Sequence, residues 1–163
     1  MTKRVLAMCV CAALVSGALS VASPAKAEVC ADRKARQTLE LRVLQSELMV
    51  AALTCNQRAG YNAFVTTFKP FLKDQGASLR AFFSAQYGPS AGPARMNRMV
   101  TRLANTASQR SIRQSTQAFC EKAKARFNTV LSADVQNVLR MARSSPTADD
   151  HGFRSCVEVA NSK

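Results

Sequence analysis

The sequence has 163 residues, of which 23 are lysine or arginine and 10 are aspartate or glutamate, so its formal net charge is +13 at pH 7. This length allows one domain with a hydrophobic core and excludes two once a leader has been removed. Arginine outnumbers lysine after the leader, and guanidinium groups form paired contacts with phosphate and carboxylate. The charge therefore indicates an anionic partner, with a basic protein that is simply soluble as the alternative.

Residues 1–27 have the features of a secretory signal peptide. Lys3 and Arg4 precede an apolar run, and the small-residue site formed by Ala25 and Ala27 follows it. Glycine and serine interrupt the run, which favours a cleaved leader over a retained membrane anchor. We therefore expect residues 28–163 to form one helical domain without a transmembrane span, located in the periplasm or secreted.

Four cysteines follow the predicted leader: Cys30, Cys55, Cys120 and Cys156. Their even number in an exported chain, without a C-x-x-C motif, predicts two structural disulfides rather than a zinc site, a redox centre or a covalent haem. On one continuous helix Cys30 and Cys55 would lie about 37 Å apart, beyond disulfide reach. Two schemes remain open, Cys30–Cys156 with Cys55–Cys120 and Cys30–Cys120 with Cys55–Cys156.

The first predicted helix spans residues 28–57. Apolar residues recur in it with helical spacing, which places them in one stripe: Leu41, Leu44, Leu48, Ala51 and Cys55. Such a stripe must be buried, so we expect the rest of the chain to cover this helix.

A second helix is expected from Tyr61 onward. Pro70 interrupts its apolar pattern and predicts a kink or a new start near Lys69. Gly76 predicts a further break, and a short helix after it should end at Gly88.

Five of the eight phenylalanines are close in the sequence and have helical spacing: Phe64, Phe68, Phe71, Phe82 and Phe83. This pattern is typical of the core of a small helical bundle. The alternative is that these side chains line a pocket for a small apolar ligand, which requires a closed cavity between the helices.

An arginine-rich helix is predicted to follow a loop at residues 89–93. Its basic side chains share one arc of the helix: Arg95, Arg98, Arg102, Arg110 and Arg113. No acid occurs in residues 75–120, so these arginines have no local countercharge. We expect them to bind an anionic partner; the alternative is a solvated helix face. An exported address argues against genomic DNA as that partner.

The last part of the chain predicts two more helices, the first capped by Ser115 or Thr116 and the second starting near Asp134. Residues 144–152 are polar and contain a proline, so they are expected to form an exposed loop. The tail after this loop should return to the bundle because Cys156 is bridged.

No catalytic or cofactor motif is found, so no cofactor is predicted. His151, the single histidine, lies beside two aspartates, and we expect an exposed loop residue rather than a metal ligand. A hydrolase stays a third hypothesis, which would require a concave cluster of His151 with carboxylates.

Two stretches, ELMVAALTCNQRAGYNAF at residues 47–64 and MNRMVTRLANTASQRS at residues 96–111, resemble small secreted bacterial helical proteins of unassigned function with paired cysteines. The resemblance covers about half of the mature chain. It implies an exported, cysteine-paired helical protein, but no activity, ligand or catalytic residue.

These patterns together predict an all-α fold, a single disulfide-stapled bundle of five or six helices. The first functional hypothesis is a non-enzymatic exported protein that binds an anionic envelope component or an acidic protein surface through its arginine-rich helix. The alternative is a carrier of a small apolar ligand among the phenylalanines. The sequence leaves the oligomeric state open.

Overall fold

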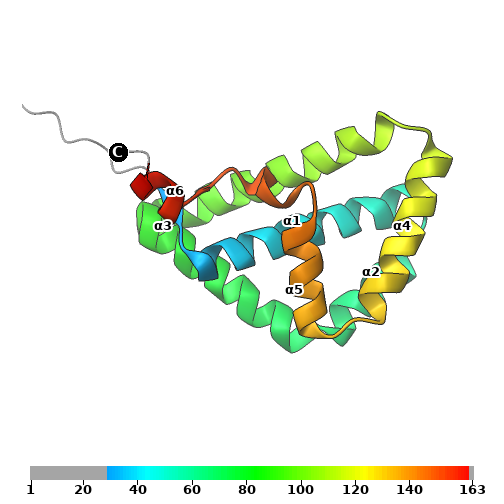
Figure 1. Ribbon diagram of the computed structural model, residues 1–163, viewed down its shortest axis with the longest axis horizontal. Coiled ribbons are helices and arrows are strands. Elements are labelled where there is room, and N and C mark those ends of the chain that lie inside the picture. Colours follow the sequence, from blue (N-terminus) through cyan, green and yellow to red (C-terminus); the bar gives the residue numbers. More distant parts are fainter. Residues whose placement is uncertain (1–28, 162–163) are drawn as a thin grey trace, which may run out of the picture.

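The computed structural model describes residues 29–161, so the predicted signal peptide lies outside the described part of the chain. Its elements, in chain order, are β1 (Cys30–Ala31), α1 (Arg33–Thr54), α2 (Arg58–Thr67), α3 (Lys69–Ile112), α4 (Thr116–Leu131), α5 (Val135–Ser144), the 3₁₀ helix η1 (Ala148–His151), β2 (Arg154–Ser155) and α6 (Cys156–Asn161). The predicted all-α, disulfide-linked bundle is confirmed (Figure 1). Within residues 29–161, none of the helices is both long and apolar enough to cross a membrane.

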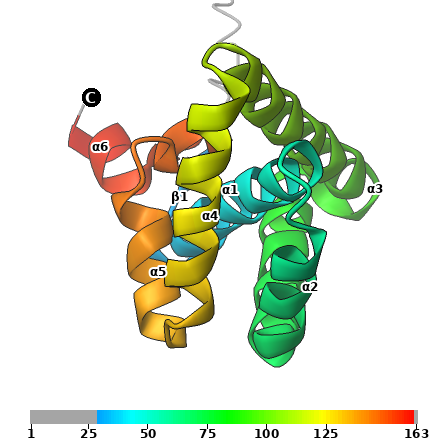
Figure 2. The same cartoon turned by 90° about the vertical axis from the view of Figure 1, so that its right-hand side faces the viewer.

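Helix α1 lies at the centre of the bundle and contacts α2, α3, α4, α5 and η1. Figure 2 shows it between α2 and α3 on one side and α4 and α5 on the other. One core cluster joins its Leu44 and Leu48 to Phe64 and Phe127, and a second joins its Leu39 to the apolar side of α3. The single stripe predicted for this helix is therefore only part of its buried surface.

The start of α1 differs from the expectation. The helix does not begin at residue 28 but after Asp32, whose side chain accepts a hydrogen bond from the Ala35 amide (2.8 Å) and caps the helix. The two residues before the cap instead pair in parallel with Arg154 and Ser155 of β2. A strand of two residues is too short to produce an alternating sequence pattern, which is why it was not predicted.

The chain between α2 and α3 follows the prediction at Pro70. Helix α2 ends at Thr67 and α3 begins at Lys69, so Pro70 occupies the first turn of the new helix. Amide groups in the first turn have no acceptor within the helix, so the missing N–H of proline costs no helical hydrogen bond. The break expected at Gly76 is wrong. A glycine inside a helix costs only about 1 kcal/mol, and the Thr38 hydroxyl of α1 fastens this turn by donating to Gln75 (2.8 Å).

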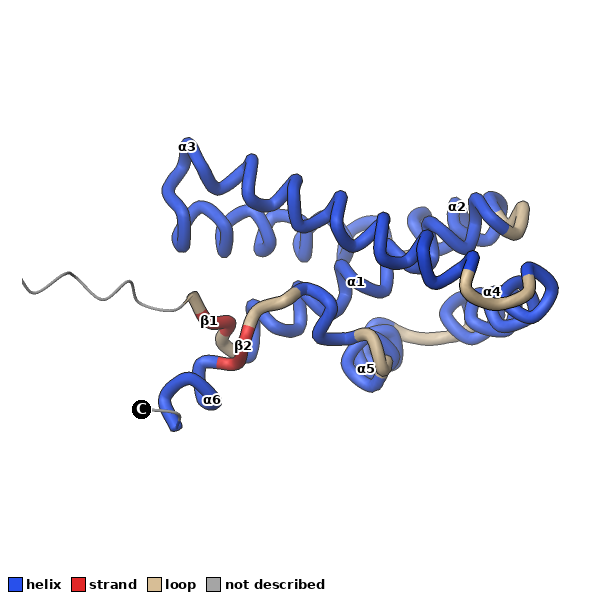
Figure 3. Tube along the Cα trace, turned by 90° about the horizontal axis from the view of Figure 1, so that it is seen from above, coloured by secondary structure: helices blue, strands red, loops and turns tan. Residues whose placement is uncertain are grey.

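Gly88 divides α3 into two halves, which meet at a sharp turn (Figure 3) and diverge from it in the view of Figure 1. Its φ of +81° with ψ of 162° is a conformation that essentially only glycine adopts. Pro89 starts the second half at once, so the loop expected at residues 89–93 is helical. Gly92 allows the two halves to pack closely, because a Cβ atom there would lie 2.8 Å from the carbonyl oxygen of Phe83.

Two disulfides connect distant parts of the chain and settle the open pairing. Cys30 is bonded to Cys156, and Cys55 is bonded to Cys120. The first bond ties the strand before α1 to α6, and the second ties the end of α1 to α4. The chain is therefore cross-linked close to both ends of the central helix.

We predict that Gly92→Ala lowers the free energy of unfolding by about 1–3 kcal/mol, the usual cost of overpacking. The new methyl group would meet the backbone of Phe83, which cannot rotate away as a flexible side chain can. Urea unfolding with intact disulfides measures the change. In the control Gly76→Ala the nearest atom is the end of Arg80 at 3.7 Å, so this variant should gain about 0.5–1 kcal/mol. Equal losses in both variants would contradict the proposed packing.

Removing either disulfide by paired Cys→Ser substitution should lower the free energy of unfolding by about 2–5 kcal/mol, because the unfolded chain regains its freedom. The bonds join residues 65 and 126 positions apart, so both close long loops. Thermal unfolding of each double variant tests the size of the effect. Peptide mapping without reduction tests the pairing, and a Cys30–Cys120 link would contradict it.

Candidate functional site

The structure divides the predicted arginine stripe into two groups. Arg95 and Arg98 lie exposed on α3, and Arg113 lies exposed at the position directly after its last residue. None of the three forms an ion pair within residues 29–161. Arg95 stacks over the ring of Tyr87, with 5.4 Å between its guanidinium carbon and the ring centroid. Arg102, although exposed, donates a hydrogen bond to the backbone oxygen of His151 (2.8 Å).

Arg110 belongs to a charge network around Glu47 of α1. It pairs with Glu47 at 3.3 Å and also with Asp150 of η1. Arg126 of α4 pairs with the other carboxylate oxygen of Glu47 at 2.7 Å and donates to the Ser145 hydroxyl (3.2 Å). Arg110 has no acidic residue close to it in the sequence, and its countercharges come from α1 and η1, which are far away in the chain.

Arg36 forms a second charge network, which also includes an aspartate of η1. It pairs with Glu40, which is only 4% exposed, at 3.3 Å, and with Asp149 at 3.4 Å. Together with Arg102, Arg110 and Arg126, this arginine holds residues 145–153 against the bundle. The segment is therefore not the exposed loop that was expected.

His151 is fully buried, which corrects the expectation of an exposed loop residue. Its Nδ1 accepts a hydrogen bond from the Phe153 amide (3.0 Å). Its Nε2 lies 3.8 Å from Asp149 and has no hydrogen-bond partner in the described part of the chain. Burial lowers the pKa of His151; Asp149 opposes this effect, whereas Arg36 and Arg102 add to it. The ring cannot meet a ligand from solvent in this arrangement.

Metal ligands do not gather in the described part of the chain. No group of three or more His, Cys, Asp or Glu side chains that could hold a metal occurs in residues 29–161. The four cysteines are taken up by disulfides, and His151 is enclosed.

The five phenylalanines proposed to form an apolar pocket lie in two different core clusters. Phe64 and Phe68 are buried in the first, where their ring centroids are 5.4 Å apart and Phe71 packs at the margin. Phe82 and Phe83 belong to the second, where both also contact the ring of Phe153. The structure therefore does not bring the five rings to one place.

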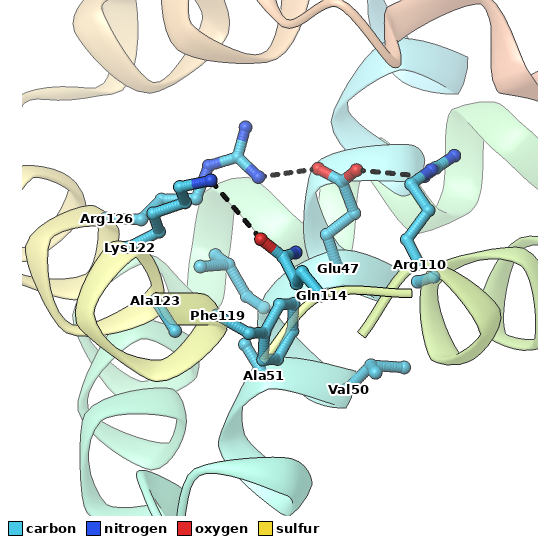
Figure 4. Close-up of a pocket in the computed structure, with 11 residues that line it drawn as sticks. Glu47, Val50, Ala51, Arg110, Gln114, Phe119, Lys122, Ala123 and Arg126 are labelled. Atoms are coloured by element: carbon cyan, nitrogen blue, oxygen red, sulfur yellow. Dashed lines mark hydrogen bonds and ion pairs between the residues drawn. The ribbon is translucent and has the colours of Figure 1, made fainter. Parts of the chain in front are cut away.

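A cleft of about 280 Å³ lies between α1, α3 and α4, beside Glu47 (Figure 4). Its polar lining residues are Glu47, Arg110, Gln114, Lys122 and Arg126. Its apolar lining residues are Leu48, Val50, Ala51, Ala107, Phe119 and Ala123. Only Arg110 among them was predicted as a site residue, because the others come from three helices and the α3–α4 connection and show no common spacing in the sequence.

No family model, curated protein or solved structure matches this chain. Its function is therefore inferred from the distribution of charge and the shape of the surface.

We predict that the protein loses stability as the pH falls below 6.5, the ordinary pKa of histidine. The unfolded chain binds a proton there, whereas buried His151 binds it only at lower pH, so the free energy of unfolding decreases by at most about 1.4 kcal/mol per pH unit. Urea unfolding between neutral pH and about pH 5 measures this slope.

Two variants isolate the contribution of this ring. His151→Gln removes the titrating group and should flatten the slope, whatever its effect on stability at neutral pH. Asp149→Asn removes the charge that opposes the lowered pKa, so the loss should continue to lower pH than in the wild type. Identical slopes in all three proteins would show that other groups cause the pH dependence.

Proposed function

We propose that this protein is a non-enzymatic, exported binding protein that docks on an anionic surface through the exposed arginines of α3. The observation that carries the proposal is the state of Arg95, Arg98 and Arg113, which are exposed and have no acidic partner within residues 29–161. The 46 residues from 75 to 120 contain no acid, so no carboxylate close in the sequence weakens the field of these arginines.

Anionic lipid headgroups are the partner that this face fits best. Ile112 is 81% exposed and lies about four helical turns beyond Arg98, within about 40° of it around the helix axis. An apolar side chain beside Arg113, at the end of a rigid helix, suits insertion between headgroups while the guanidinium groups bind phosphate. An acidic protein surface offers no comparable environment for the isoleucine.

Export is supported by two further features. The predicted leader at residues 1–27 would direct the chain out of the cytoplasm. Both disulfides require an oxidising compartment to persist. The structure does not support the two alternative functions. A carrier of an apolar ligand would need the five phenylalanines in one place, but they are divided between two clusters. A hydrolase would need an accessible His151, but this residue is enclosed.

We predict that the mature protein binds vesicles containing anionic phospholipid and not vesicles of neutral phosphatidylcholine. The double variant Arg95→Gln, Arg98→Gln should bind roughly thirtyfold more weakly, since each basic residue near an anionic surface contributes about 1 kcal/mol. Binding should weaken as salt shortens the range of the charges. Co-sedimentation across a salt series measures both effects.

The matched control is Arg58→Gln, Arg140→Gln, which removes the same charge from exposed positions on α2 and α5. It should retain most of the binding. An equal loss in both double variants would show that total charge, not this face, determines binding. Absence of binding by the wild type would reject a lipid partner.

A further inference from the structure

The cleft between α1, α3 and α4 has a charged side and an apolar side, and it is separate from Arg95 and Arg98. Figure 4 shows the charged ends on one side: Arg126, Lys122, Glu47 and Arg110. Apolar side chains lie opposite them: Phe119, Val50 and Ala51. A cleft polarised in this way is complementary to a ligand that is itself amphiphilic.

The charged side has more positive than negative groups. Lys122 donates a hydrogen bond to the neutral amide oxygen of Gln114 (3.2 Å) and has no carboxylate partner within residues 29–161. Arg110 and Arg126 share the one carboxylate that lines the cleft, that of Glu47. Asp150 pairs with Arg110 from outside the lining.

The three cations can therefore hold an anion without losing their present partners. Each guanidinium group has five N–H donors, of which the pairs described use only some. The Lys122 ammonium has three donors, and a neutral amide is its partner. One ligand anion would offset the surplus charge at this end of the cleft.

Three of the six apolar residues that line the cleft are alanines. Ala51, Ala107 and Ala123 face the cleft from α1, α3 and α4, and the Phe119 ring forms a wall. The alanines leave the space open where larger residues would fill it. The Cys55–Cys120 disulfide joins α1 to α4 next to Phe119, so the width of the cleft is fixed before a ligand arrives.

We propose that this cleft binds a small anionic amphiphile. A carboxylate or phosphate head group lies against Lys122, Arg110 and Arg126, and an apolar part lies over the alanines and Phe119. The cleft volume of about 280 Å³ holds roughly nine water-sized groups at about 30 Å³ each. A linear carboxylate of about eight carbons fills that space, so octanoate is the appropriate probe.

Three probes separate the two halves of the proposed ligand. Isothermal titration calorimetry compares octanoate with acetate, which has the head alone, and with 1-octanol, which has the tail alone. Octanoate should bind at least about tenfold more tightly than either, because each half contributes its own contacts. If acetate binds as tightly as octanoate, the cleft is a simple anion site and the proposal is wrong. If 1-octanol binds as tightly as octanoate, the charged side chains do not contribute to binding and the proposal is also wrong. If octanoate does not bind, the proposed class of ligand is rejected.

A lysine pair supplies the matched variants. Lys122→Gln removes a cation that lines the cleft, whereas Lys124→Gln removes an exposed cation of the same helix that does not line it. The first should weaken octanoate binding about tenfold and the second should not. Equal weakening would assign the effect to general surface charge and overturn the proposal.

Two readouts make this result independent of the docking function. Amide chemical shifts of Ala51, Phe119 and Ala123 should change on octanoate addition, which places the ligand in the cleft; changes confined to other residues would reject the site. The variant Arg95→Gln, Arg98→Gln should bind octanoate like the wild type. Failure of vesicle docking would therefore leave the cleft proposal standing, and failure of octanoate binding would leave docking standing.

Discussion

Burial of α1 on most of its surface is the constraint on which the rest of this structure depends. Leu39, Leu41, Leu44 and Leu48 are enclosed by elements from both sides of the bundle, so the helix contributes to both core clusters at once. Two glutamates of the same helix, Glu40 and Glu47, are drawn inward with them. A carboxylate in such surroundings needs a paired cation, because an unpaired buried charge costs several kcal/mol.

The demand for cations explains how the arginines are distributed. Glu40 takes Arg36, and Glu47 takes Arg110 and Arg126. Arg36 and Arg110 also pair with the aspartates of η1, so ion pairs help to hold the polar segment after α5 against the bundle. Within residues 29–161, Arg95 and Arg98 of α3 and Arg113 at its end form no ion pair and lie exposed. The same sequence of basic residues thus serves both internal pairing and external binding.

The disulfides have a second consequence besides stability. Cys55 follows α1 directly and Cys120 lies within α4, so the bond between them ties together two of the helices that line the cleft. A preformed cleft costs less conformational entropy on binding than one that must be assembled. A rigid α3, divided only at Gly88, likewise presents its arginines without further ordering.

By itself, the sequence determined the helical class, a kink or new start near Lys69, a cap at Ser115 or Thr116, a helix start near Asp134, and the cysteines that had to pair. These features depend on periodicity and on interactions between residues close in the chain, which a sequence shows directly. Only the tertiary structure decided which disulfide scheme forms, that helix continues through Gly76, that His151 is buried, and that Arg110 faces Glu47 instead of solvent. Each of these outcomes depends on a partner many residues away, and the packing around α1 determines which partners come close enough to interact.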